Sequence, residues 1–170
     1  MTRSMRLLLM SVLCVTVSAP IARAKTSQPS LNQSPMGQPA DERAAQAALP
    51  KSQSPVWGKF LQSKVSYNNH TGLYSIAVTP EIRAMAGTQI TINGFVLPLD
   101  GSDHTSHFLL TRNTPVCMFC PPGEPNEVVE VISPHPIEWT DKIVTVTGPL
   151  GLINNGEKGM FFKIVANSVR

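Results

Sequence analysis

The sequence has few cysteines, no apolar run long enough to cross a bilayer, and no excess of basic side chains beyond its first two dozen residues. A membrane-spanning helix needs about 20 apolar residues, and the longest apolar run, residues 7–15, is shorter. Without Arg3, Arg6 and Arg23 the Lys and Arg count falls from 14 to 11, which equals the 11 Asp and Glu residues. A neutral chain lacks the clustered basic side chains that bind nucleic acid or an anionic membrane surface.

The first 24 residues have the pattern of a secretory signal peptide. Arg3 and Arg6 precede the apolar run 7–15, and the small-x-small sequence Ala22-Arg23-Ala24 follows it. These three parts are the basic start, short apolar middle and cleavage site of an exported protein. We therefore expect cleavage after Ala24 and a periplasmic mature protein.

Residues 25–55 have the composition of a flexible linker. They contain no aromatic residue and few large aliphatic residues, so they can bury little apolar surface to offset the entropy of ordering. A short helix over 41–49, ending before Pro50, would be marginal by itself. We expect one folded domain, over residues 56–170.

The domain has a β pattern. Runs rich in Val, Ile, Thr and Phe, bounded by Gly, Pro, Asn and Asp, are typical of strands. They occupy residues 88–97, 106–111, 127–132, 142–148 and 160–165, with one more around 73–78. A turn over 154–159 suits a hairpin between the last two runs. One short helix is predicted from Thr79-Pro80 to Gly87, because Thr is a capping residue, Pro suits the first turn and Gly ends helices.

Two glycines interrupt strand patterns in similar surroundings. Gly94 follows Ile90-Thr91-Ile92-Asn93, and Gly148 follows Val144-Thr145-Val146-Thr147. A glycine within a strand marks a bulge or a tight bend, and small barrels turn their corners at such bends. The pattern favours a small antiparallel barrel of the oligonucleotide/oligosaccharide-binding (OB) shape, with a β-sandwich as the alternative.

A candidate metal site lies between residues 104 and 120. It comprises His104 and His107 and the Cys-x-x-Cys pair Cys117 and Cys120. Thiolate and imidazole are the ligands that zinc takes tetrahedrally, and copper(I) accepts the same soft set. Asp100 and Asp103 are then expected to accept hydrogen bonds from the imidazole nitrogens that do not bind the metal.

Two other uses of the cysteines remain open. Cleavage of the signal peptide removes Cys14, so in an oxidising compartment Cys117 and Cys120 could form a local disulfide within an interaction module. So small a loop gains the least stability from a disulfide. A thiol oxidoreductase is a third possibility, but Pro121 and Pro122 prevent the helix that would lower the pKa of the first thiol.

No motif of an enzyme is present: the sequence has no nucleophile elbow, no Gly-rich phosphate loop and no His-Glu-x-x-His. We therefore predict a binding protein with no catalytic residues and no organic cofactor.

Four segments resemble a known family in their order along the chain. They are 94–99 (Gly-Phe-Val-Leu-Pro-Leu), 107–110 (His-Phe-Leu-Leu), 117–121 (Cys-Met-Phe-Cys-Pro) and 126–131 (Asn-Glu-Val-Val-Glu-Val). The chain is similar from about Trp57 to its end to bacterial domain-of-unknown-function family 3299. The resemblance implies an exported or lipid-anchored protein. Some members are encoded beside a transporter cassette and periplasmic proteins of zinc supply, which implies an ABC-transporter system or another periplasmic protein as partner.

Overall fold

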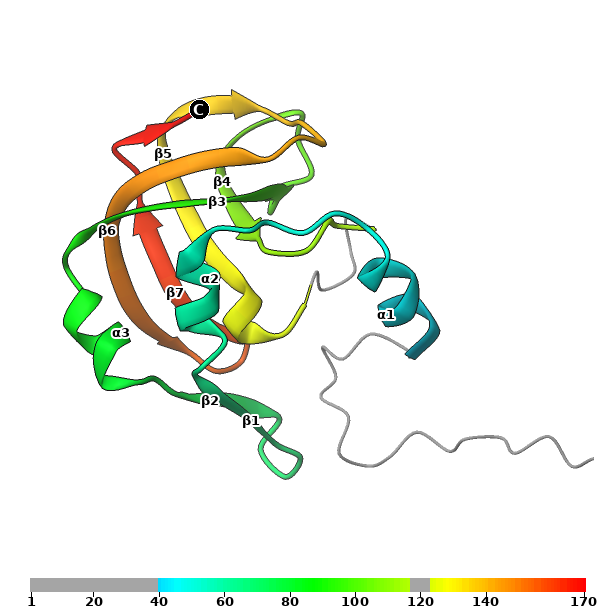
Figure 1. The fold of residues 1–170 in the computed structure, drawn as a ribbon, viewed down its shortest axis with the longest axis vertical. Helices are drawn as coiled ribbons and strands as arrows, with labels where there is room; N and C mark the ends of the chain where they lie inside the picture. Colours follow the sequence, from blue (N-terminus) through cyan, green and yellow to red (C-terminus); the bar gives the residue numbers. More distant parts are fainter. Residues whose placement is uncertain (1–39, 117–122) are drawn as a thin grey trace, which may run out of the picture.

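A closed five-stranded barrel forms the centre of the protein (Figure 1). The computed structural model describes residues 40–116 and 123–170, with the side chains from residue 43 onward. The elements are α1 (Ala40–Ala47), α2 (Pro55–Phe60), β1 (Lys64–Asn68), β2 (Leu73–Ala77), α3 (Pro80–Met85), β3 (Gln89–Pro98), β4 (His104–Thr111), the 3-10 turn η1 (Pro125–Glu127), β5 (Val128–Glu138), β6 (Val144–Asn155), β7 (Met160–Val165) and β8 (Ser168–Val169). Among the described residues, no helix has the length and apolar character that crossing a bilayer requires.

The order of strand pairing identifies the barrel as OB-like. The strands pair in the order β3-β4-β5-β7-β6, and β6 pairs with β3 to close the sheet. This closed Greek-key arrangement is that of an OB barrel, so the structure confirms the predicted barrel and excludes the sandwich. The predicted all-antiparallel pairing is wrong in one place, because β5 and β7 run parallel. Strand β6 lies between β5 and β7 in the sequence, and β7 pairs antiparallel to β6 and parallel to β5.

The two predicted corner glycines lie where strands change partners. β3 pairs with β6 as far as Gly94 and with β4 from Phe95 onward. A Cβ atom at Gly94 would lie 2.6 Å from the carbonyl oxygen of Thr111, and one at Gly148 would lie 2.6 Å from that of Val165. Only glycine lets the backbones approach this closely, so both positions turn the sheet as the sequence predicts.

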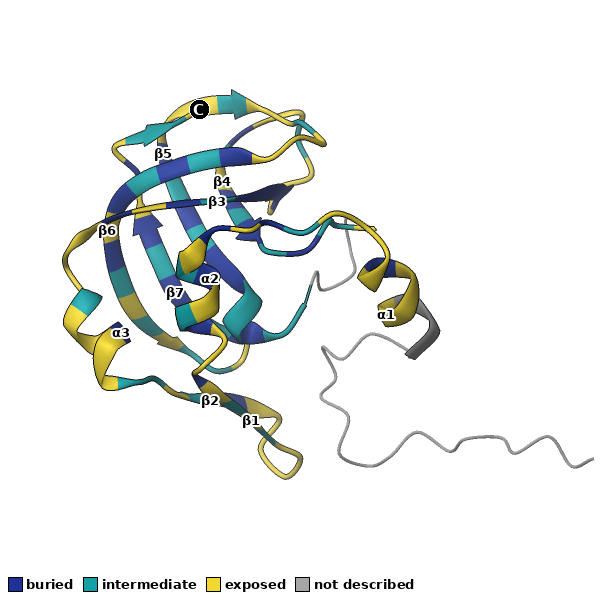
Figure 2. Cartoon of the chain, in the orientation of Figure 1, coloured by how far each residue is buried: buried dark blue, intermediate teal, exposed yellow. Residues whose placement is uncertain are grey.

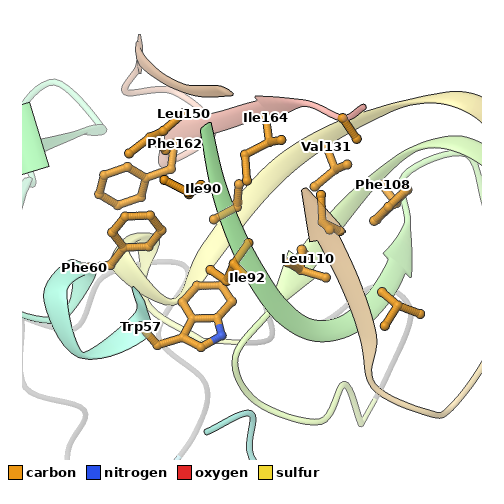
Figure 3. Close-up of a cluster of buried hydrophobic side chains, with 14 of the residues drawn as sticks. Trp57, Phe60, Ile90, Ile92, Phe108, Leu110, Val131, Leu150, Phe162 and Ile164 are labelled. Carbon is orange, nitrogen blue, oxygen red and sulfur yellow. The ribbon is translucent and has the colours of Figure 1, made fainter. Parts of the chain in front are cut away.

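The apolar side chains of the strands fill the barrel interior (Figure 3), and Figure 2 shows the buried positions along the same strands. Ile92, Phe108 and Leu110 belong to this buried cluster. Helix α2 adds Trp57 and Phe60 to it, and the Phe60 ring stacks on Phe162 with ring centroids 4.2 Å apart. Burying two aromatic side chains ties the short α2 to the barrel, because a helix of six residues is not stable alone.

The chain contacts the barrel before residue 56, the expected start of the domain. The Trp57 indole Nε1 donates to the Asn93 carbonyl oxygen at 2.8 Å and to the Ser52 hydroxyl at 3.1 Å. The Ser52 hydroxyl donates to the same Asn93 carbonyl at 2.6 Å. Lys51 forms an isolated β-bridge with Asn113. Composition alone gives no sign of these contacts, because they are hydrogen bonds rather than apolar burial.

Several elements match their predicted ranges, and others extend beyond them. Helix α3 begins at the predicted cap, where the Thr79 hydroxyl accepts from the Ile82 N–H at 3.3 Å. Strand β5 continues six residues beyond the predicted end at Ile132, through Pro134 and Pro136. Its pairing with β4 is irregular over this stretch, because proline has no N–H to donate to the ladder. The predicted linker contains α1 close to the range 41–49; residues 25–39 lie outside the described part.

Candidate functional site

His107 is held in an ion-pair cluster on the outer face of the barrel. Its Nε2 atom lies 2.8 Å from Oε1 of Glu130 on the neighbouring strand β5. Lys163 on β7 lies 3.4 Å from the same oxygen. The Glu130 side chain is only 12% exposed, whereas that of His107 is 49% exposed. The carboxylate is therefore fixed in the sheet surface and holds the imidazole toward solvent.

His104 lies at the first position of β4 and is exposed. It pairs in register with Glu138, the last residue of β5. The neighbouring Trp139 N–H donates to the Asp103 carbonyl oxygen at 2.7 Å. The β3–β4 turn and the connection from β5 to β6 thus lie against each other at one end of the barrel (Figure 1).

His107 and Asp100 each have another partner in this structure, and the support of metal-bound imidazoles by Asp100 and Asp103 stays a prediction. The imidazole of His107 contacts Glu130, whereas Asp100 accepts hydrogen bonds from the Ser102 hydroxyl at 2.8 Å and the Ser102 N–H at 3.2 Å. These two hydrogen bonds lower the pKa of Asp100 below its ordinary value. The sequence placed Asp100 close to the histidines along the chain, but the neighbouring strand brings Glu130 closer in space.

Cys117 and Cys120 lie outside the described residues, and the chain on either side of them is well anchored. On the N-terminal side, the Thr114 hydroxyl donates to the Pro50 carbonyl oxygen at 2.6 Å, and the Thr114 carbonyl oxygen accepts from Gln46 Nε2 at 3.1 Å. On the C-terminal side, Glu127 accepts from the Arg112 guanidinium at 2.9 Å. Each flank of the cysteine segment is therefore held by side chains from elsewhere in the chain.

Within the described residues, no three His, Cys, Asp or Glu side chains form a group that could hold a metal ion. His104 and His107 lie three residues apart on one strand, which spans about 10 Å of extended chain. A metal site that uses these histidines depends on further ligands outside the described residues, and the predicted ligands Cys117 and Cys120 lie there. Sequence reasoning missed Glu130 as the partner of His107, and the only available signal was an acidic side chain between Val129 and Val131.

The family model described as protein of unknown function (DUF3299) matches residues 26–160. A search of curated proteins found no match. Among solved structures, the crystal structure of a DUF3299 family protein from Pseudomonas aeruginosa PAO1 is similar, with 22% sequence identity and a TM-score of 0.46. The match covers 56% of this chain and 66% of that one. Because the family model covers most of the sequence, the chain belongs to the DUF3299 family.

Proposed function

We propose that this member of the DUF3299 family is an exported zinc-binding protein, with copper as the second candidate metal. The proposed ligands are Cys117, Cys120 and His107, with His104 as the fourth. The metal would be cargo, and the protein would serve an ABC-transporter system or another periplasmic protein as an accessory in metal homeostasis.

The contact between His107 and Glu130 carries this proposal. Histidines that bind zinc usually have their second ring nitrogen held by a carboxylate or a carbonyl group, which fixes the orientation of the ring. Glu130 engages Nε2 of His107 at 2.8 Å, and this leaves Nδ1 as the nitrogen that would bind the metal. The half-exposed ring is accessible to an incoming ion. Residue types and orientation at this position therefore fit a zinc ligand.

The course of the chain before Cys117 supports the same set of ligands. Val116 lines a pocket together with Leu97 and Trp139. Leu97 pairs with Leu109, two residues from His107, and the Trp139 N–H donates to Asp103, the residue before His104. Val116 thus shares a pocket with Trp139, whose N–H bonds to the residue before His104, while the β3 residues of that pocket pair with the C-terminal half of β4.

The direct test is a Co²⁺ titration of the reduced protein, because thiolate ligands give Co²⁺ a charge-transfer absorption. We expect about one equivalent to bind, and Zn²⁺ to displace it. Cys117→Ser and Cys120→Ser should abolish the charge-transfer band. Glu130→Gln should weaken binding about 10- to 100-fold, as loss of such supporting carboxylates does. Glu157→Gln, in the distant β6–β7 hairpin, is the matched control.

Other outcomes would contradict the proposal. Full affinity in Cys117→Ser would rule out the cysteines as ligands. Two blocked thiols and no metal, in protein isolated from the periplasmic fraction without reductant, would favour an interaction module with a Cys117–Cys120 disulfide. Reduction of insulin disulfides by the protein would favour a thiol oxidoreductase. Elemental analysis of the same periplasmic preparation identifies the metal that is bound in the cell.

A further inference from the structure

A small apolar pocket lies at the end of the barrel where β3 ends and β5 leads into β6. Its volume is about 240 Å³. Among the described residues, the side chains that give it its character are Phe95, Leu97, Pro115, Val116, Trp139 and Asp141. Pockets for drug-sized ligands are about 300–1,000 Å³, so this one suits a smaller molecule. We call it the Trp139 pocket.

The Trp139 pocket is open to solvent on the side formed by Trp139 and Val116. Trp139 is 49% exposed and Val116 is 45% exposed, whereas Phe95 and Leu97 are buried at the base. Large apolar side chains that stay exposed around a cavity are typical of a binding site, because in the absence of a ligand their burial in the protein would be favourable. The Trp139 indole can therefore contact a ligand that packs on the apolar base formed by Phe95 and Leu97.

Asp141 is the one charged residue among the described residues that line the Trp139 pocket. The Trp139 backbone N–H donates to the backbone carbonyl oxygen of Asp103, which places the β3–β4 turn beside this part of the chain. The basic residues nearest to the lining along the chain are Lys142, next to Asp141, and Arg112, whose guanidinium donates to Glu127. The described lining therefore carries an acidic group and no basic one.

This combination selects a particular ligand chemistry. An anion would meet the Asp141 carboxylate, and a bare metal ion would need three converging ligands, which the described residues do not provide here. An ammonium group surrounded by apolar carbon satisfies both halves of the site. Its charge is attracted by the indole face and by Asp141, and its methyl groups pack against Leu97 and Val116. Recognition of quaternary ammonium groups is an established use of aromatic side chains in binding sites.

We propose that the Trp139 pocket binds a small organic cation of the quaternary ammonium type. This site is separate from the metal ligands of the proposed function and does not require them. Trp139 supplies the aromatic face, Asp141 the opposite charge, and the aliphatic base the shape that excludes larger ligands.

Calorimetry with choline and with 3,3-dimethyl-1-butanol tests the proposal, because the two molecules share one shape and differ in charge. The titrations use the whole protein with a chelator present, so that the metal site has no influence. We expect choline to bind, and the neutral alcohol to bind at least about tenfold more weakly. Trp139→Leu should weaken choline binding about tenfold or more, and Asp141→Asn about threefold. Glu157→Gln should leave it unchanged.

Equal affinity for choline and the neutral alcohol would overturn the proposal and leave an apolar pocket without charge selection. Failure of choline to bind at tens of millimolar would also overturn it, as would unchanged affinity in Trp139→Leu. The half-exposed Trp139 contributes less to folding than a buried residue does, and thermal unfolding verifies that the variant is folded. A result of choline binding with no Co²⁺ binding would separate this site from the proposed metal function.

Discussion

The two tryptophans place the same side chain in opposite environments. Trp57 is 1% exposed, packs edge-on against Phe60 at 5.9 Å, and has its indole N–H bonded to Ser52 and Asn93. Trp139 is 49% exposed and lines a pocket that also includes Asp141. A buried aromatic ring with a satisfied N–H stabilises the fold. An exposed ring that lines a pocket can contact a ligand.

The same difference distinguishes the two parts of the molecule to which the tryptophans belong. The N-terminal segment and α2 bury their aromatic residues in the core cluster around β3 and β7. The turns at the Trp139 end keep apolar and acidic side chains accessible. In the proposed assignment, stability and recognition depend on different residues, and substitutions at the two tryptophans should separate them.

The largest expected effect follows from Trp57→Ala. Removing a fully buried tryptophan should lower the free energy of unfolding by about 3–5 kcal/mol, because it leaves a cavity and removes the indole N–H that donates to Ser52 and Asn93. Trp139→Ala should lower it by less, because this side chain is 49% exposed in the folded protein and its removal loses less apolar burial. Chemical denaturation of both variants measures the difference, and equal losses would remove the distinction between the two tryptophans.

A smaller effect is expected at the corner beside Asn93. Gly94→Ala places a Cβ atom 2.6 Å from a backbone oxygen, and such overpacking should cost about 1–3 kcal/mol. Gly58 in α2 has no atom within 4 Å of the same position. Gly58→Ala should therefore be stabilising by about 0.5–1 kcal/mol, since alanine favours helix. Unfolding midpoints of the pair check both signs; a stable Gly94→Ala would mean that the sheet can turn there without glycine.

The smallest effect concerns the hydrogen bonds around Trp57. Ser52→Ala removes the hydroxyl that joins the indole to Asn93, and we expect a loss of about 1 kcal/mol in the free energy of unfolding. Ser54 is a close control, because its side chain makes no capping hydrogen bond to α2. Ser54→Ala should cost less than Ser52→Ala under the same denaturant. The reverse order would show that the N-terminal segment is held by packing alone.

Short sequence patterns predicted the structural elements that depend on interactions between neighbouring residues. Helix α3 follows from Thr79, Pro80 and Gly87, because capping and turn chemistry act within a few residues. The corners at Gly94 and Gly148 were predictable for a similar reason, since a break in the alternation shows where a strand must bend. The strand runs and two corners predicted a small barrel or a sandwich, and the strand pairing decided for the barrel.

Contacts between distant residues could not be predicted in the same way. The proline-containing end of β5 follows from pairing with β4, although Pro134 and Pro136 disfavour a strand locally. The parallel pairing of β5 with β7 depends on the crossover through β6. Glu130 reaches His107 from 23 residues away, while the nearer Asp100 turns back to Ser102.

The sequence by itself determined the class of fold, the places where the sheet bends and the residue types that can bind a metal, because alternation, capping and ligand chemistry are properties of single residues and short segments. Tertiary structure alone decided which carboxylate holds His107, which tryptophan is buried, and that Val116, Trp139 and Asp141 meet around one pocket. These depend on strand register and on barrel closure, which bring together residues that no local pattern connects.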